Sequence, residues 1–202
     1  MRVTETFVSL QGEGERQGTP CFFLRLSGCN LRCAWCDTEY SFEKGMERSV
    51  DTIVEEIAQS KLSYVCITGG EPLLQKEELR SLLEILKAAN ISVDIETNGT
   101  IPFDDITEFA SICMDVKCPS SGVISDLSLL AHLQKKDCVK FVIGDEADYL
   151  YMVEVLAAHK PTAPVIITPV FGTDTKWLIE TIIEERLPVR FQLQLHKLVN
   201  VQ

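Results

Sequence analysis

The stretch Cys29-Asn30-Leu31-Arg32-Cys33-Ala34-Trp35-Cys36 carries three cysteines in the spacing C-x3-C-x2-C, shortly after an apolar, strand-like run at residues 20–26. Three closely spaced thiolates are one too few for a closed tetrahedral metal site. They suffice to hold three irons of a cubane iron–sulfur cluster and leave the fourth iron open. A metal with an open coordination position can bind and activate a small molecule, so the loop indicates chemistry rather than electron transfer alone.

The other cysteines favour a reduced, cytoplasmic protein. Cys66, Cys113 and Cys138 lie inside apolar runs, where free cysteine usually behaves as a small buried hydrophobe. The N-terminus is polar and no apolar stretch approaches the ~18 residues of a membrane span. A structural zinc site would need a second ligand pair, and the three histidines are widely scattered. Iron–sulfur is therefore favoured over zinc.

Composition sets further limits. The 202 residues predict a single domain over 1–202. The formal charge of −11 is spread along the chain, without a basic stripe interleaved with aromatic residues. Direct nucleic-acid binding is therefore not expected.

Apolar, β-branched runs alternate with longer segments of helical period. The expected strands are 21–26, 64–68, 92–96, 112–117, 139–143, 165–168 and 190–193. The expected helices are 50–59, 76–89, 103–109, 126–135, 148–159 and 176–185. In the second of these, leucines recur at the i, i+3, i+4, i+7 spacing of one helix face. The expected N-caps are Ser49, Ser125, Asp145 and Thr173.

This alternation predicts an α/β fold with right-handed βαβ units and a mainly parallel sheet. About six units are too few to close an eight-stranded barrel, so a partial, open β/α barrel is favoured over a flat doubly wound sheet. In both architectures ligands gather at the carboxyl ends of the strands. The unusual residues fall there: Cys29 to Cys36, Gly69-Gly70-Glu71-Pro72, Glu96-Thr97-Asn98-Gly99, Asp115-Val116-Lys117 and Thr168-Pro169-Val170.

The diglycine turn is the second informative motif. Gly69 and Gly70 let the backbone approach a ligand closely, and carbonyls exposed there can accept hydrogen bonds from an ammonium group. Glu71 either adds an anionic acceptor or holds the loop through local hydrogen bonds. Trp35 either shields a bound group or packs at the base of the loop.

The cysteine loop and the GGEP turn together resemble the radical S-adenosylmethionine superfamily. The resemblance implies a 4Fe–4S cluster on Cys29, Cys33 and Cys36, whose open iron chelates the amino and carboxylate groups of S-adenosylmethionine. Cleavage of the sulfonium then gives a radical that removes hydrogen from a substrate. The cofactor contacts that the resemblance implies are Gly70, Glu71, Glu96, Asp115, Val116, Lys117, Thr168, Pro169 and Val170.

Further segments narrow the resemblance to the 7-carboxy-7-deazaguanine synthase family. They are Leu10-Gln11-Gly12-Glu13-Gly14, Cys36-Asp37-Thr38, Glu96-Thr97-Asn98-Gly99-Thr100 and His196-Lys197-Leu198-Val199-Asn200. The family resemblance implies a lyase that contracts 6-carboxy-5,6,7,8-tetrahydropterin to 7-carboxy-7-deazaguanine with loss of ammonia, on the route to queuosine in tRNA. It also implies a magnesium ion, a flavodoxin- or ferredoxin-type electron donor and a homodimer.

Candidate substrate residues follow from the same resemblance. They are Leu10, Gln11, Gly12, Arg25, Thr68, His196 and the terminal carboxylate of Gln202, with Thr38 as the magnesium ligand. A strand-borne guanidinium such as Arg25 suits a carboxylate, although a structural salt bridge is its alternative role. A threonine hydroxyl is a plausible hard-oxygen donor for magnesium.

Two other functions stay open. A glycyl-radical activase would need a groove for a partner loop, and it would gain nothing from a C-terminal clamp on a pterin. A non-enzymatic electron-transfer module would carry a cluster that is blind to S-adenosylmethionine, and it leaves the diglycine turn unexplained.

Overall fold

The computed structural model describes residues 1–43 and 45–201, and within them one nine-stranded sheet runs in the order β3-β1-β2-β4-β5-β6-β7-β8-β9. The strands are β1 (Arg2–Leu10), β2 (Pro20–Leu26), β3 (Met46–Glu47), β4 (Tyr64–Gly69), β5 (Ser92–Thr97), β6 (Ser111–Val116), β7 (Cys138–Ile143), β8 (Val165–Pro169) and β9 (Arg190–Phe191). The helices are α1 (Val50–Ser60), α2 (Lys76–Ala88), α3 (Glu146–His159), α4 (Lys176–Glu185) and α5 (Leu195–Val199).

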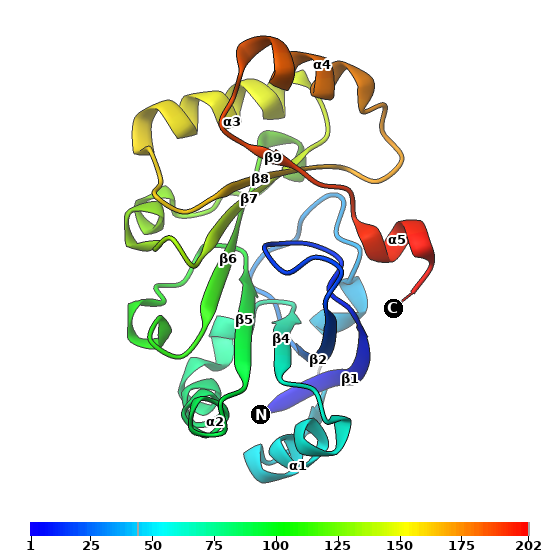
Figure 1. Cartoon of the computed structure of the whole chain (residues 1–202), viewed down its shortest axis with the longest axis vertical. Coiled ribbons are helices and arrows are strands. Elements are labelled where there is room, and N and C mark those ends of the chain that lie inside the picture. The colour runs from blue at the N-terminus through cyan, green and yellow to red at the C-terminus, as the bar shows by residue number, and fades with distance from the viewer. Residues whose placement is uncertain (44, 202) are drawn as a thin grey trace.

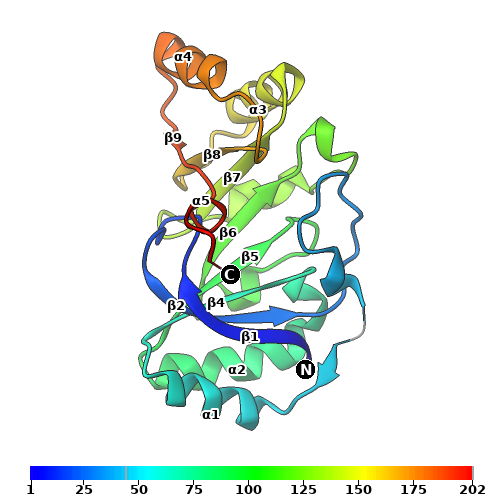
Figure 2. The same cartoon turned by 90° about the vertical axis from the view of Figure 1, so that its right-hand side faces the viewer.

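The sheet is an open, mainly parallel barrel, as the alternating pattern predicted. Neighbouring strands pair in parallel along the order β2-β4-β5-β6-β7-β8-β9. Strand β1 pairs antiparallel with β2, and β3 pairs antiparallel with β1. Figure 1 shows the sheet curving, with α1 to α4 around its outside, and Figure 2 shows β1 and α5 on the open side. The curvature decides against the flat, doubly wound alternative.

The central parallel strands present apolar residues outward and several polar or charged residues inward, because side chains alternate along a strand. Outward residues such as Leu24, Ile67 and Phe141 join the main core beneath the helices. The parallel register places inward residues side by side: Arg25 beside Thr68, and Asp115 beside Lys140. The interior of the barrel therefore carries charged groups beside smaller apolar clusters, which include Phe23 and Ile166.

Helix packing follows the predicted periodicity. The leucine face of α2 is fully buried: Leu79, Leu82, Leu83 and Leu86. Ser49 and Asp145 cap α1 and α3 by accepting backbone N–H groups, as predicted. The caps predicted at Ser125 and Thr173 are wrong. The Ser125 hydroxyl donates to the Asn98 carbonyl, and the Thr173 hydroxyl donates to the carbonyl of Val170.

Two predicted helices are short 3-10 turns instead. In place of 103–109 the chain forms one turn, Asp104–Ile106, and Phe103 and Ile106 already fill the core there. In place of 126–135 it forms Leu127–His132. The Asp137 carboxylate accepts from the backbone of Gln134 and Ile112 and so ties the following chain to β6.

Within the described residues, the strands β1 and β3, the helix α5 and the 3-10 turns Glu39–Phe42, Pro72–Gln75 and Pro119–Ser121 were not predicted. Strand β1 has a polar middle, Thr4-Glu5-Thr6, which hides its alternation. The last predicted strand, 190–193, is also shorter, Arg190–Phe191. Within residues 1–43 and 45–201, no helix has the length and apolar character needed to cross a bilayer.

Candidate active site

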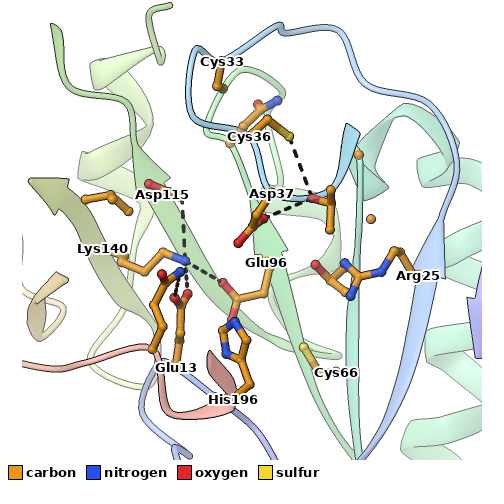
Figure 3. Close-up of a pocket in the computed structure, with 18 of the residues that line it drawn as sticks. Glu13, Arg25, Cys33, Cys36, Asp37, Cys66, Glu96, Asp115, Lys140 and His196 are labelled. Atoms are coloured by element: carbon orange, nitrogen blue, oxygen red, sulfur yellow. Dashed lines mark hydrogen bonds and ion pairs between the residues drawn. The ribbon is translucent and has the colours of Figure 1, made fainter. Parts of the chain in front are cut away.

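A cavity of about 580 Å³ lies at the carboxyl ends of the parallel strands, on the inner face of the sheet. Figure 3 shows its charged and sulfur-bearing side chains, which come from the strands, from the cysteine loop and from the C-terminal segment. The predicted site residues that line it are Leu10, Gln11, Gly12, Arg25, Cys29, Cys33, Cys36, Thr38, Thr68, Gly70, Glu96, Asp115, Lys117, Val170 and His196. The fold thus brings most of the predicted set to one cavity.

The three cysteines of the loop are half-buried free thiols that line this cavity together. Burial raises the pKa of the Cys33 thiol. Among the described residues, no three Cys, His, Asp or Glu side chains stand at the spacing of metal ligands. The donor chemistry nevertheless fits a cluster held through three sulfurs, because three soft ligands from one loop face one space.

The cysteine loop is held against the barrel by hydrogen bonds. Gly28 adopts a φ of +93°, which lets the chain turn sharply before Cys29. The backbone N–H of Ala34 donates to Ser121 O at 2.9 Å, and the Trp35 indole donates to Ser120 Oγ at 3.1 Å. Trp35 therefore anchors the base of the loop and lines the cavity, and its shielding of a bound group stays a prediction.

The diglycine turn is packed against the cysteine loop. A Cβ atom on Gly70 would lie 2.1 Å from the Gly28 carbonyl oxygen, so only glycine fits there. The backbone N–H of Glu71 donates to that same carbonyl at 2.8 Å. The two motifs that the sequence singled out therefore form one continuous wall.

Glu71 holds this wall from behind. Its side chain is fully buried and is absent from the cavity lining that the described residues form. Its carboxylate accepts from Leu73 N at 3.0 Å, Thr97 Oγ1 at 2.9 Å and Asn98 N at 2.7 Å. Burial raises the Glu71 pKa, while these donors oppose the rise. Of its two possible roles, the geometry supports loop support rather than direct contact.

The ends of β5 and β6 bring charged groups to the cavity. Glu96 lies at its wall, and burial raises the pKa of its carboxyl group although Lys140 opposes the rise. Lys117 Nζ donates to Asp115 Oδ2 at 2.8 Å and lies 5.3 Å from the centre of the Trp35 ring. Burial lowers the Lys117 pKa, but Asp115 outweighs it and the net shift is upward, which keeps the side chain charged.

Three predicted cofactor residues are buried and are not among the described residues that line the cavity. Val116 belongs to the outer core, and Thr168 and Pro169 are buried in β8. Among the described residues, none bonds to Thr168 Oγ1, although it is buried. Val170, directly after β8, does line the cavity. The register pairs Thr168 with Val142, which lines the cavity, so the Thr168 side chain lies on the inner face of the sheet.

The loop after β1 forms the opposite wall. The Gln11 side-chain amide donates to Tyr64 Oη at 3.2 Å and to Cys66 Sγ at 3.3 Å, which fixes the loop on the barrel floor. The backbone N–H of Leu195 donates to Gly12 O at 3.0 Å. His196 lies against Gly12, and burial lowers the pKa of its imidazole.

Arg25 lies on the inner face of β2, with Thr68 beside it in register. Its Nε donates to Glu5 Oε1 at 2.8 Å, and its guanidinium carbon lies 5.7 Å from the centre of the Phe7 ring. These contacts hold the guanidinium at the cavity wall. Arg25 thus forms the salt bridge of its alternative role and also lines the cavity, and its pairing with a substrate carboxylate stays a prediction.

Thr38 lies beside the cysteine loop. Its hydroxyl donates to Asp37 Oδ1 at 3.4 Å and lies 3.9 Å from Cys36 Sγ. Asp37 in turn forms an ion pair with Lys197 of α5 at 2.7 Å. The predicted contact through Gln202 falls outside the described residues.

Sequence reasoning missed the charged pair Glu13 and Lys140. Lys140 Nζ lies 2.5 Å from Glu13 Oε2, and Glu13 Oε1 accepts from Gln194 Nε2 at 2.7 Å. Lys140 lies inside the run 139–143, whose apolar character predicts a strand, and Glu13 lies inside the segment Leu10-Gln11-Gly12-Glu13-Gly14. The signal was the two-residue alternation of the strands, which places Glu96, Asp115 and Lys140 on one face.

Substitution of Gly12 by alanine is expected to detach the C-terminal segment. The added Cβ would lie 2.0 Å from His196 Nδ1, so the imidazole and α5 must move. Hydrogen exchange in residues 193–199 should rise strongly, while α2 stays protected. The double variant Gly12→Ala/His196→Ala should restore much of the protection, because the imidazole is gone. Unchanged exchange in Gly12→Ala would contradict this packing.

Several known proteins are similar to this chain in sequence, and some of known structure are similar to it in fold. The pattern of the Radical SAM superfamily matches residues 24–116. The 7-carboxy-7-deazaguanine synthase of Methanospirillum hungatei is 49% identical over 201 residues, covering 100% of this chain and 86% of that protein. The enzyme of the same name from Koribacter versatilis is 39% identical, covering 98% of this chain and 96% of the relative.

Two solved structures are similar to this chain in fold. The crystal structure of QueE from Escherichia coli gives a TM-score of 0.79 at 27% identity, covering 96% of this chain and 94% of that one. Streptococcus suis SuiB bound to S-adenosylmethionine gives a TM-score of 0.60 at 14% identity, covering 85% of this chain and 48% of SuiB. The second likeness concerns the fold alone.

Proposed function

The chain belongs to the 7-carboxy-7-deazaguanine synthase family, and from this premise we propose a substrate, a cofactor set and a role for each wall of the cavity. The substrate is 6-carboxy-5,6,7,8-tetrahydropterin, and the product is 7-carboxy-7-deazaguanine with release of ammonia. The observation that carries the proposal is the shared cavity, which three cysteines line on one side and Gln11, Arg25 and His196 line on the other. Family membership sets aside the activase and electron-transfer alternatives.

Cys29, Cys33 and Cys36 hold the 4Fe–4S cluster, with S-adenosylmethionine beside it. The fit rests on three free thiols facing one space and on Gly70, which brings backbone to the edge of that space. When bound, the cluster and S-adenosylmethionine supply the removal of a hydrogen atom from the substrate. The enclosing walls exclude water from the reacting atoms.

The nucleotide half of the site is assigned to the strand ends. Glu96 accepts from ribose hydroxyls, and Asp115 and Lys117 face the polar groups of the cofactor. The backbone of Thr168, Pro169 and Val170 borders the adenine. Val116 and Glu71 support this wall from behind, because their side chains are buried.

The pterin half is assigned to β2, the loop after β1, and α5. The Arg25 guanidinium pairs with the substrate carboxylate, since a planar fork of donors matches two carboxylate oxygens. Leu10, Gln11, Gly12 and Thr68 border the flat ring through backbone and hydroxyl groups. His196 borders the ring from the C-terminal side.

Magnesium is assigned to Thr38, together with substrate oxygens and water. Magnesium prefers oxygen ligands and seldom has an all-protein cage, so one hydroxyl is a sufficient protein contribution. The Asp37 carboxylate accepts the hydrogen bond of this hydroxyl, which supports the orientation of Thr38. We further propose one domain over 1–202, a homodimer, a cytoplasmic location and a flavodoxin- or ferredoxin-type electron donor.

The test is anaerobic turnover by the reconstituted protein. With 6-carboxy-5,6,7,8-tetrahydropterin, S-adenosylmethionine, magnesium and dithionite, we expect one 7-carboxy-7-deazaguanine and one ammonia per pterin consumed. S-adenosylmethionine should not be consumed in proportion. A protein with an intact cluster that forms no deazapurine chromophore would contradict the proposed function.

A further inference from the structure

Lys140 is a buried lysine that three carboxylates surround, each from a different segment of the chain. Its Nζ lies 2.5 Å from Glu13 Oε2 and 3.7 Å from both Glu96 Oε2 and Asp115 Oδ2. Figure 3 shows the ammonium at the centre of these groups on the cavity wall. Glu13 belongs to the loop after β1, Glu96 to β5 and Asp115 to β6.

The ammonium is charged despite its burial. Burial lowers the Lys140 pKa, but Glu13, Asp115 and Glu96 together raise it well above its usual value. Burial also raises the pKa of Glu13, and Lys140 reverses this effect, so that the net shift is downward. A buried cation shared by several anions fixes their relative positions, because like charges repel strongly in a low-dielectric interior.

One side of this cluster supports the proposed pterin half of the site. Glu13 accepts from Gln194 at 2.7 Å, and the adjacent Gly12 carbonyl accepts from Leu195 N at 3.0 Å. These two bonds attach the start of α5, and with it His196, to the loop after β1. Lys140 therefore anchors, through Glu13, the segments that border the ring of the substrate.

The other side supports the proposed nucleotide half. Glu96 Oε2 and Asp115 Oδ1 are buried, and within the described residues neither accepts a hydrogen bond. Glu96 Oε2 instead forms an ion pair with Lys140 at 3.7 Å. A buried carboxylate oxygen without a hydrogen bond costs free energy unless a charge or a ligand compensates it.

We propose that Lys140 is a positioning residue shared by both halves of the active site, holding Glu13 for pterin binding and Glu96 for S-adenosylmethionine binding. This inference rests on the proposed function, since the identities of the two ligands come from it. Its distinctive consequence is a pattern: each acid serves one ligand, whereas the lysine serves both. A role in packing alone would not produce this pattern.

The experiment measures the two dissociation constants separately, by calorimetry on anaerobic holoenzyme, with S-adenosylmethionine and with the oxidised, unreactive 6-carboxypterin. Lys140→Met should raise both dissociation constants by roughly tenfold or more, as expected for removal of one partner of a buried charge pair. Glu13→Gln should weaken only the pterin, and Glu96→Gln only S-adenosylmethionine. Lys140→Arg, which keeps the charge, should recover most of both affinities.

Two further variants serve as controls, one for the loss of any lysine and one for misfolding of Lys140→Met. Lys87→Met removes an exposed lysine that pairs with Glu108, and it should change neither constant. Should Lys140→Met fail to fold, the double variant Glu13→Gln/Lys140→Met removes one charge of each sign. It should fold, lose affinity for both ligands and show faster hydrogen exchange in 11–18 and 193–199 than wild type.

The possible outcomes separate the two proposals. Wild-type holoenzyme that binds S-adenosylmethionine but not the carboxypterin contradicts the proposed function. Wild-type holoenzyme that binds both, together with a folded Lys140→Met or double variant that binds either ligand normally, contradicts only the role of Lys140. Loss of both affinities in these variants, with one-sided losses in Glu13→Gln and Glu96→Gln, supports it.

Discussion

Replacement of Cys33 by alanine is expected to abolish both the iron–sulfur cluster and turnover. The cysteine loop brings three thiols to the cavity, so loss of one leaves the loop with two ligands for four irons. No other chemistry in the cavity replaces hydrogen-atom removal, and product formation should fall by at least about 10³-fold, beyond ordinary detection. Iron and sulfide analysis, with electron paramagnetic resonance of the reduced protein, measures the cluster directly. Cys29→Ala and Cys36→Ala should behave alike.

The matched control is Cys138→Ala, the same deletion at a buried cysteine of β7. It should lower the free energy of unfolding by about 1–2 kcal/mol through lost packing, while retaining iron and sulfide. Cys66→Ala should also keep its cluster, although Cys66 accepts a hydrogen bond from Gln11. Loss of iron in either control would show that the ligand set is wrong. A complete cluster in Cys33→Ala that still responds to S-adenosylmethionine would show the same.

Replacement of Arg25 by methionine is expected to give the second large effect, now on substrate binding. A charge-assisted hydrogen bond contributes about 1.5–3 kcal/mol, so loss of a bidentate pair should raise KM for the carboxypterin roughly 100-fold or more. Arg25→Lys should have a KM between those of wild type and Arg25→Met, because an ammonium group keeps the charge but lacks the planar guanidinium. The cluster content should stay at the wild-type level, because Arg25 lies on β2 and not in the cysteine loop.

A pterin without the 6-carboxylate distinguishes a direct contact between Arg25 and that carboxylate from an indirect effect of Arg25 on the packing of the cavity wall. If Arg25 pairs with that carboxylate, wild type and Arg25→Met should bind this analogue equally weakly. A variant that weakens both pterins by the same factor would indicate that Arg25 acts through its salt bridge to Glu5 instead. Arg80→Met, which removes an exposed arginine of α2 paired with Glu84, serves as the control and should leave KM unchanged.

The regular part of the fold was predictable, because its signals are local. The leucine face of α2 and the caps at Ser49 and Asp145 each depend on neighbouring residues. Strand β1 was missed because its polar middle suits an antiparallel strand with one wet face, not a buried parallel strand. Helix α5 was missed because its position depends on distant contacts, with Gly12 and Asp37.

The candidate site likewise has a part that local sequence motifs predict and a part that depends on residues far apart in the chain. The cysteine loop and the diglycine turn carry their chemistry in adjacent residues, so spacing alone pointed to them. The cluster around Lys140 joins residues 13, 96, 115 and 140, and only the register of β5, β6 and β7 brings them together. Glu71 shows the opposite limit, since its motif left both a ligand contact and a loop support open, and its three hydrogen bonds favour the loop support.

The bonds between the loop after β1 and the C-terminal segment have a consequence for biogenesis. Gly14 N donates to Gln192 Oε1 at 3.0 Å, and Gln17 Nε2 donates to Leu193 O at 2.7 Å. This wall of the cavity can therefore form only after residue 193 has emerged from the ribosome, whereas the cysteine loop is synthesised early. Iron delivered to a nascent chain would therefore reach the cysteine loop before this wall of the cavity has formed, and residues 192–193 would complete the wall afterwards.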